Sequence, residues 1–444
     1  MIVGLLLIEA PISNAAQTTP PDWYFLVVIV KNTDIPYEEN GVSKHYKETM
    51  TMDEMNMIRR RAIEAITYMT EVGVMQAHID IVEIDEPITK LASTPTADGK
   101  ETWWVGPDDI QPLLDGKNLQ TTQYDHVYGC IKLLNLPDAL LMEKEQPLYV
   151  GLGGLTFENG TSYSLIRNNF NEREFNFADW DPTGLYVHEF LHFIEQQGRK
   201  WGFEFDEHKI GDMYEKQGRK YSTSEKLDAW KNLYTDILLN RADGEYGTGV
   251  APFIWNYSPR VLRNTTELVI PDGVTTLGDY AFMNMDNLTK VTFPESLISI
   301  GNNAFDQYDT NKNLVIDFLP ANLSYIGECA FRATKLTASI PASVQTLKGG
   351  AFSQCEQLQQ LIFPEGLTTI EDFIADRTTA LKRIYIPASV TKIGRAAFLY
   401  SAVNEIYFGG SQAQWNAIEI GANNDPLKNA VVHFNVNSSE LAWN

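Results

Sequence analysis

The stretch Ile384–Phe398, IYIPASVTKIGRAAF, is the clearest copy of a unit that recurs through the second half of the chain. Each copy has a short aliphatic run ending in proline, then an aliphatic residue usually followed by glycine, then Ala-Phe. The prolines that mark the copies are 23, 26, 21, 23 and 23 residues apart, at Pro271, Pro294, Pro320, Pro341, Pro364 and Pro387. A fixed period of this length predicts a solenoid of stacked strand-and-turn units, because one unit cannot bury its apolar residues alone.

The repeats strongly resemble BspA-like leucine-rich repeats from Leu268 to about Asn435. The fifth copy departs from the pattern, with Ile370-Glu371 and then Phe373-Ile374-Ala375. From Ile406 the sequence resembles the C-terminal cap that follows such arrays. We therefore expect a leucine-rich-repeat domain over residues 260–444, binding a protein or a surface polymer.

Composition limits the classes of function open to the chain. Its 444 residues predict two or three domains, and its net charge of −23 disfavours a nucleic-acid partner. The three cysteines exclude a disulfide framework, although Cys329 and Cys355 lie in neighbouring repeats and are either paired or free. Residues 1–22 resemble a truncated signal peptide, and no run is long enough for a transmembrane span. A secreted or cell-surface protein is expected.

Residues 23–248 read as an α+β domain with a mixed sheet. Buried strands are expected over Tyr24–Val30, His78–Ile84, Tyr124–Leu133 and Leu148–Phe157, and an amphipathic helix over Met52–Val72. A short helix is expected over Asp108–Leu114. Gly198 is expected to end the helix that carries His188, and a mostly helical segment should follow as far as Asn240.

The sharpest motif is His188-Glu189-Phe190-Leu191-His192. Two histidines four residues apart lie one helical turn apart on one face, where both imidazoles can bind one Zn²⁺ ion. Glu189 would then lie beside the metal as the general base. The surrounding residues are apolar, which predicts a buried helix. Burying two histidines and a glutamate is costly unless they are paired or bind a metal, so their presence in such a helix favours a metal site.

A catalytic zinc site needs a third protein ligand, and three residues are candidates. His208 is favoured, Asp212 shares its helix face as an orienting partner or a replacement, and Glu195 lies one turn beyond His192. The remaining histidines, His45, His78, His126 and His433, share no ligand spacing and are expected to be ordinary surface or strand residues.

The HExxH helix, preceded by a strand containing Gly151-Leu152-Gly153-Gly154, resembles the zincin metallopeptidases. The resemblance implies a zincin-like catalytic domain ahead of the leucine-rich-repeat solenoid, with His188, His192 and His208 on Zn²⁺ and Glu189 activating water to hydrolyse a peptide or protein substrate. It also implies that the glycine-containing strand lies at a sheet edge and binds the substrate backbone. The alternative is a surface adhesin whose zincin domain is catalytically weak.

Overall fold

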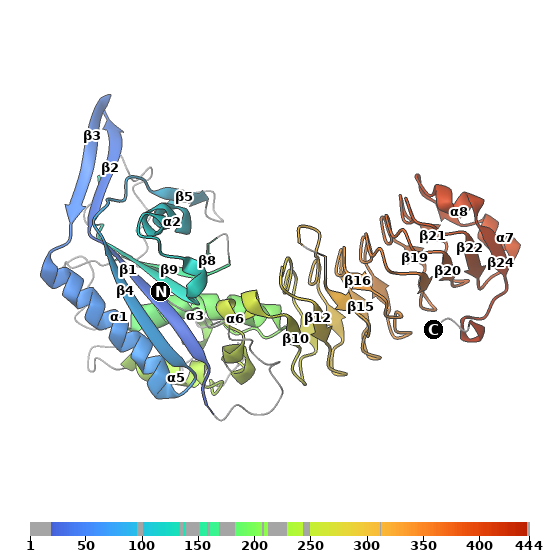
Figure 1. The fold of residues 1–444 in the computed structure, drawn as a ribbon, viewed down its shortest axis with the longest axis horizontal. Coiled ribbons are helices and arrows are strands. Elements are labelled where there is room, and N and C mark those ends of the chain that lie inside the picture. The colour runs from blue at the N-terminus through green and yellow to red at the C-terminus, as the bar shows by residue number, and fades with distance from the viewer. Residues whose placement is uncertain are drawn as a thin grey trace, which may run out of the picture. The chain divides into compact units, whose positions relative to one another are not determined.

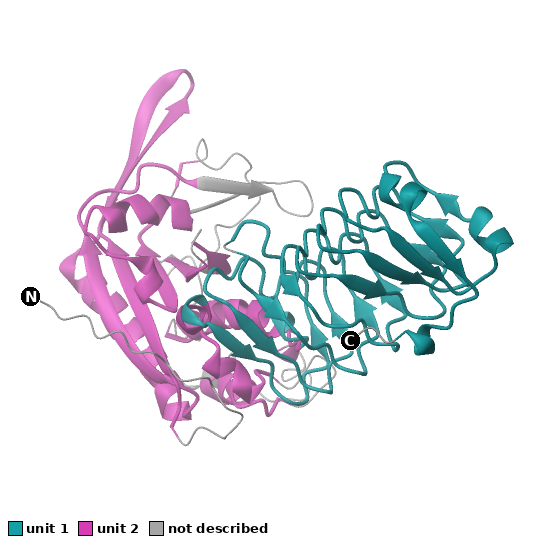
Figure 2. Ribbon diagram, turned by 45° about the vertical axis from the view of Figure 1, so that its right-hand side comes forward, with its two compact units in different colours: residues 1–16, 199–202, 263–444 teal, residues 17–198, 203–262 magenta. Residues whose placement is uncertain are grey.

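The computed structural model describes residues 19–95, 101–133, 136–137, 151–157, 160–167, 183–206, 208–211, 229–242, 249–310 and 312–441. The chain folds as two compact units (Figure 2). The N-terminal unit comprises residues 17–198 and 203–262, and the repeat unit comprises residues 1–16, 199–202 and 263–444. The expected leader, residues 1–22, lies almost wholly outside the described residues. Within them, no helix combines the length and the apolarity needed to cross a bilayer.

A five-stranded mixed sheet forms the centre of the N-terminal unit, in the order β4-β1-β7-β9-β8 (Figure 1). Strands β4, β1, β7 and β9 are parallel, and β8 joins the edge of the sheet antiparallel to β9. The strands span Asp22–Val30 (β1), Gln76–Ile84 (β4), His126–Ile131 (β7), Gly151–Thr156 (β8) and Ser162–Arg167 (β9). Strand β1 lies between β4 and β7. Nearly all of its residues are buried, as its continuous apolar run predicts.

Helices lie beside this sheet, and two hairpins extend the unit. The expected helix over Met52–Val72 is present as α1, which begins at the Thr51–Glu54 capping box and ends at Gly73 with φ of 86°. The other elements are β2 (Asn32–Glu39), β3 (Val42–Thr49), β5 (Ala92–Pro95), β6 (Glu101–Trp104), α2 (Pro107–Asp115), η1 (Thr121–Gln123), α3 (Thr183–Lys200), α5 (Ala229–Leu238), η3 (Pro252–Asn256) and α6 (Pro259–Asn264).

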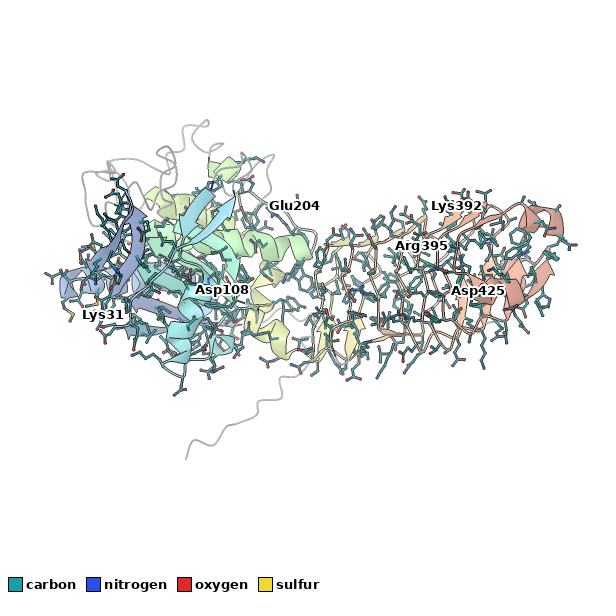
Figure 3. The ribbon with its side chains drawn as sticks, turned by 90° about the horizontal axis from the view of Figure 1, so that it is seen from above. Lys31, Asp108, Glu204, Lys392, Arg395 and Asp425 are labelled. Atoms are coloured by element: carbon teal, nitrogen blue, oxygen red, sulfur yellow. The ribbon has the colours of Figure 1, made fainter. Side chains whose placement is uncertain are left out.

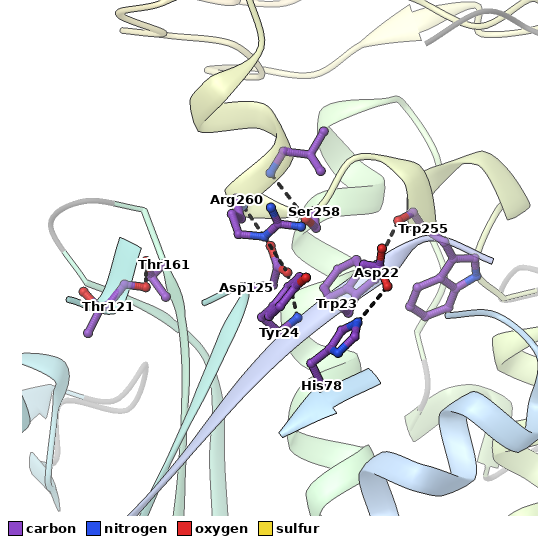
Figure 4. Close-up of polar contacts among 11 residues, drawn as sticks. Asp22, Trp23, Tyr24, His78, Thr121, Asp125, Thr161, Trp255, Ser258 and Arg260 are labelled. Atoms are coloured by element: carbon purple, nitrogen blue, oxygen red, sulfur yellow. Dashed lines mark hydrogen bonds and ion pairs between the residues drawn. The ribbon is translucent and has the colours of Figure 1, made fainter. Parts of the chain in front are cut away.

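The residues just before the repeats belong to the N-terminal unit as far as Leu262, beyond the boundary expected at residue 248. The indole N–H of Trp23 donates to the Trp255 carbonyl oxygen at 2.8 Å, and the Trp255 ring stacks on Phe190 of α3 at 6.5 Å between centroids. Nearby, buried Asp125 accepts the backbone N–H groups of Tyr24 and Arg260, both at 2.9 Å (Figure 4). The segment that contains Trp255 and Arg260 therefore packs against the sheet and against the helix that carries the HExxH motif.

Helix α3 runs two residues past the end expected at Gly198, so that expectation was wrong. A Cβ atom at Gly198 would lie 2.7 Å from the carbonyl oxygen of Phe203. Glycine is therefore needed there for close packing, because any side chain would collide with the returning backbone. The left-handed residue after the helix is Gly202, with φ of 71°.

The repeat unit is a solenoid of short parallel strands. Each copy contributes one strand to each of two rows, and neighbouring copies pair in register. The first row contains β10 (Glu267–Val269), β12 (Lys290–Thr292), β14 (Val315–Ile316), β16 (Lys335–Leu336), β18 (Gln360–Ile362), β20 (Arg383–Ile386), β22 (Glu405–Phe408) and β24 (Val431–Phe434). The second row contains β11 (Thr276–Leu277), β13 (Ser299–Ile300), β15 (Tyr325–Ile326), β17 (Thr346–Leu347), β19 (Thr369–Ile370), β21 (Lys392–Ile393) and β23 (Glu419–Ile420). The end of the chain adds α7 (Gln412–Asn416), α8 (Asp425–Asn429) and η4 (Ser438–Glu440).

The conserved spacing of Ala-Phe builds a column of aromatic rings through the solenoid. Phe331 stacks nearly parallel on Phe305 and on Phe352, with centroids 6.0 and 6.4 Å apart. At the other end of the column, Trp201 packs edge-on against Phe282 at 5.0 Å, so residues 199–202, which include Trp201, belong to the repeat unit. All three cysteines are free, and the Sγ atom of Cys355 donates to the Phe331 carbonyl oxygen at 3.1 Å.

Candidate metal centre

Helix α3 presents His188 and His192 from an otherwise buried surface. Its apolar residues pack against the sheet, as Phe190 does against Phe25 at 5.5 Å between ring centroids. The two histidine side chains are 20% and 25% exposed, and their ring centroids are 4.9 Å apart. The helical spacing therefore places both imidazoles together at the solvent-facing margin of a buried helix.

A short turn brings His208 to the same place. The Asp206 side chain accepts the backbone N–H of Lys209 at 2.9 Å, and Asp206 carbonyl oxygen accepts the N–H of Ile210 at 2.9 Å. Ile210 is fully buried and anchors the turn. The exposed His208 ring then lies 5.0 Å from His188 and 5.1 Å from His192, measured between centroids.

The three histidines offer one nitrogen each within 4.8 Å of one another. Tetrahedral zinc with bonds of about 2.0–2.1 Å to imidazole holds its ligand nitrogens roughly 3.3 Å apart. Small side-chain rotations would therefore close this cluster around one ion. Among the described residues, the cluster supplies three imidazoles, and three protein ligands are the donor set of a catalytic rather than a structural zinc site, so these residues fit Zn²⁺.

The other ring nitrogen of each helical histidine has a partner of its own. Nδ1 of His188 lies 3.2 Å from the hydroxyl of Tyr234 on α5, and Nδ1 of His192 lies 3.6 Å from Oε2 of Glu195. Such partners orient imidazole ligands and leave Nε2 for the metal. Glu195 thus lies against the outer nitrogen of His192, and Asp212 is outside the described residues.

Glu189 is buried beside this cluster. Its side chain is 5% exposed, and Oε1 lies 3.9 Å from Nε2 of His188. The backbone at this position is also held in place, because the Ser164 hydroxyl on β9 donates to the Glu189 carbonyl oxygen at 3.1 Å. A carboxylate in this position is within reach of a water molecule bound between it and the three imidazoles.

The edge strand β8 packs directly on α3 through two glycines. A Cβ atom at Gly153 would lie 2.0 Å from the Glu189 carbonyl oxygen, which no side chain could tolerate. Gly154 has φ of 74°, and its carbonyl oxygen accepts a hydrogen bond from Gln196 Nε2 at 2.7 Å. The glycines in the expected strand therefore bring the sheet edge against the HExxH helix.

Sequence reasoning missed some supporting residues. Strand β9, which carries Ser164, and Tyr234 as the partner of His188 were not recognised. The alternation in Ser162–Arg167 could have revealed the strand, whereas Tyr234 carried no signal beyond its apolar helix face.

The remaining histidines stand apart from the cluster. His126 is fully buried, with Nδ1 2.6 Å from the Ser162 hydroxyl, and burial lowers its pKa to about 3. His78 pairs with Asp22, His45 pairs with Asp34, and the His433 ring stacks on Tyr407.

Comparison with known proteins places the recognisable family in the second half of the chain. A family model described as BspA type leucine rich repeat region matches six copies, over residues 260–338 and 325–423. No curated protein matches the chain.

The solved structures that are similar include a leucine-rich repeat protein from Bacteroides ovatus, with 23% identity over 36% of this chain and 52% of that one, and a TM-score of 0.25. They also include a leucine rich cell surface protein from Faecalibacterium prausnitzii, with 25% identity over 34% of this chain and 62% of that one, and a TM-score of 0.18. The pneumococcal vaccine antigen PcpA is 17% identical over 39% of this chain and 40% of its own, with a TM-score of 0.23. The chain thus spans 40–62% of the length of these three proteins. The family match confirms the predicted repeats: residues 260–423 are a BspA-type leucine-rich-repeat region.

Proposed function

We propose that the N-terminal unit is a zinc-dependent metallopeptidase of the HExxH, zincin-like kind, and that the repeat unit is a binding module for a protein or a surface polymer. The observation that carries the catalytic part is the convergence of His188, His192 and His208 within 4.8 Å beside the buried Glu189. A secreted or cell-surface location is proposed with it, since one similar structure is described as a cell surface protein.

The residues have distinct roles in this proposal. His188, His192 and His208 would hold the ion, which would supply Lewis-acid activation of water and of the scissile carbonyl. Glu189 removes a proton from the attacking water and delivers it to the leaving amine nitrogen. Tyr234 and Glu195 keep the two helical imidazoles in the orientation that the ion needs, through contacts of 3.2 and 3.6 Å to their outer nitrogens.

Strand β8 supplies a surface for the substrate backbone. Among the described strands it is the last in the order of the sheet, so no described strand pairs with its outer edge, and we expect that edge to pair with an extended peptide. Because Gly153 lies against the Glu189 carbonyl oxygen, a peptide added to this edge would run along the strand that packs on the backbone of Glu189. This arrangement supports a peptide bond, held in extended form, as the bond that is cleaved.

The test is Glu189→Gln in the full chain, with exposed Glu204→Gln as the matched control. Loss of a general base typically lowers the rate on the order of 10²–10⁴-fold. We expect Glu189→Gln to keep about one zinc per chain by elemental analysis while losing peptide hydrolysis to that extent, and the control to keep both. Hydrolysis at the parent rate by Glu189→Gln would show that Glu189 is not the base.

A second candidate function is a surface adhesin with a catalytically weak first unit. It is favoured by one finding, that the family match begins at residue 260 and covers the repeats. The same experiment separates the two: an adhesin would bind zinc with no measurable peptide turnover by the parent protein. The intact His188-Glu189-Phe190-Leu191-His192 motif supports the enzyme.

A further inference from the structure

The repeat unit contains a groove of about 910 Å³ that is lined by five copies of the repeat, from Asn302 in the second copy to Arg395 in the sixth. It lies along the second row of strands, from Tyr325 on β15 to Lys392 on β21, and along the turns that follow these strands. Every residue that lines it belongs to the repeat unit.

The groove crosses a discontinuity in the solenoid. The pairing of the second row ends at β17 and starts again at β19, and the first row is divided in the same way between β16 and β18. The turns remain joined, because the N–H of Gly350 donates to the Asp372 carbonyl oxygen at 3.1 Å and that of Phe352 to Ile374 at 2.9 Å. The two halves of the solenoid are therefore held through their turns, while the paired strand rows are interrupted beneath the groove.

Two successive glycines let neighbouring turns pack closely at the floor of the groove. The hydrogen bonds between turns align Gly349-Gly350 with Asp372-Phe373 and with Arg395-Ala396 in the next two copies. A Cβ atom at Gly350 would lie 2.8 Å from the Sγ atom of Cys329, so the Cys329 thiol already fills the space beside this glycine. In the next copy the aligned residue is Phe373, which also lines the groove.

The groove concentrates positive charge in an acidic protein. Five of the twelve Lys and Arg residues in 263–444 line it, against four of the eighteen Asp and Glu residues. Arg332 is held in a close ion pair with the buried Asp306. The other four cations make longer pairs: 3.4 Å for Lys348–Glu371, 3.5 Å for Lys392–Glu419, 3.8 Å for Arg395–Asp372 and 3.9 Å for Arg377–Asp376. Exposed pairs of this length are weak, so these four cations can exchange their partners for an anionic ligand at little cost.

Aromatic rings hold two of these guanidinium groups in place. The Arg395 guanidinium lies 4.9 Å from the Phe373 ring centroid, and that of Arg377 lies 5.9 Å from the Tyr400 ring. Figure 3 labels Lys392 and Arg395 close together along the solenoid. A guanidinium that is positioned by a ring keeps its planar N–H groups available for a carboxylate or sulfate.

We infer that this groove binds an acidic oligosaccharide, a chain of sugars bearing carboxylate or sulfate groups. The cations take the anionic groups, and the intervening carboxylates of Glu371, Asp372 and Asp376 accept hydrogen bonds from sugar hydroxyls. A sugar ring offers several hydroxyl donors to these carboxylates, whereas an acidic peptide offers one backbone N–H for each residue and adds further carboxylates beside them. A nucleic acid is disfavoured by the net charge of −23. The inference rests on the binding role proposed for the repeat unit and is independent of the peptidase.

The test is a calorimetric titration of the full chain with four probes: oligogalacturonate, chondroitin sulfate oligosaccharide, poly-glutamate and a neutral cello-oligosaccharide. We expect binding of one or both acidic sugars, weakened by salt, and at least about tenfold weaker binding of the other two. Lys348→Gln with Arg395→Gln should weaken the acidic sugar about tenfold or more, since charge-assisted hydrogen bonds are lost. The matched control is Lys335→Gln with Lys428→Gln, two cations outside the groove, which should change affinity less than about twofold.

A further variant, Phe373→Asn, removes the ring without adding backbone strain. Phe373 has φ of 56°, and the aligned positions of other copies carry Asn303 and Asn423 at 53° and 64°. We expect Phe373→Asn to weaken sugar binding several-fold with an unchanged melting temperature. Absence of binding to both acidic sugars, equal binding of poly-glutamate, or full affinity in the Lys348 and Arg395 double variant would each overturn the inference. None of these outcomes bears on peptide hydrolysis, which is measured separately.

Discussion

The two units of this protein are assembled from contacts of very different range along the chain. In the repeat unit, Phe305 packs between Phe282 and Phe331, which are 23 and 26 residues away. In the N-terminal unit, the Trp23 side chain donates a hydrogen bond to Trp255, 232 residues away. In the repeat unit, each copy is stabilised by contacts with the copies next to it. The N-terminal unit instead depends on contacts between segments that are far apart in the sequence. We therefore expect damage to stay local in the repeats and to spread in the N-terminal unit.

The largest effect is expected at the three proposed metal ligands. His192→Ala and His208→Ala should each reduce zinc from about one per chain to near none after dialysis, because two imidazoles hold the ion far less tightly than three. Glu195→Gln should weaken zinc binding roughly 10–100-fold, the usual loss for a residue that orients a ligand. His78→Gln, an exposed histidine outside the cluster, serves as the control.

Elemental analysis and chelator competition measure these affinities. If His208→Ala retained zinc while Glu195→Ala released it, Glu195 would be the third ligand and the assignment of His208 would be wrong.

A cavity in the aromatic column tests whether the repeats respond locally. Phe331→Ala should lower the free energy of unfolding of the repeat unit by about 3–5 kcal/mol, the usual loss for a buried phenylalanine. The N-terminal unit should keep its zinc, and chemical denaturation should show two separated transitions. Tyr400→Ala, at a residue that is 65% exposed, is the control. Loss of zinc together with the repeats would show that the two units unfold as one.

A single methyl group tests the packing of the edge strand on the metal helix. Gly153→Ala should lower the free energy of unfolding by about 1–3 kcal/mol and reduce hydrolysis, because its Cβ would lie 2.0 Å from the Glu189 carbonyl oxygen. Gly116→Ala is the matched control, since its nearest neighbours lie at 3.5 and 3.6 Å. Equal stability and activity of the two variants would mean that β8 does not pack on α3 at Gly153.

The smallest effect is a dependence of stability on pH in the N-terminal unit alone. Burial lowers the pKa of His126 to about 3 in the folded chain, against about 6.5 when unfolded, so the unfolded chain binds the proton first as pH falls. The stability from neutral His126 is present above pH 6.5 and is lost toward pH 3, by about 1.4 kcal/mol between pH 7.5 and pH 5.5.

Denaturant titrations at the two pH values measure this difference. His126→Leu should abolish most of it, and His78→Gln should leave it intact. A pH dependence unchanged by His126→Leu would place its origin at other groups.

The structure also changes how the units should be separated in the laboratory. A chain that ends at the domain boundary expected at residue 248 would carry all of the expected zincin-like domain. It would lack Trp255, which packs on Phe190 of the metal-binding helix, and Arg260, whose backbone N–H donates to buried Asp125. Such a chain should therefore be unstable, and a boundary after Leu262 follows the division of the molecule more closely.

The sequence by itself determined the period of the repeats, the helix at Met52–Val72 and the placement of His188 and His192 on one helical face, because each depends on neighbours within one turn or one repeat. The sequence favoured His208 as the third ligand over Asp212 and Glu195, and the family resemblance implied an edge position for the glycine-containing strand. Only the tertiary structure brought His208 beside the other two histidines, placed Tyr234 and Glu195 against their outer nitrogens, and packed β8 on Glu189. The spacing of the prolines did not predict the interruption of the strand rows, since Pro341 and Pro364 on either side of it are 23 residues apart, as in other copies. Such features depend on which distant backbone segments become neighbours in the fold. The periodicity of side chains along the chain does not specify those neighbours.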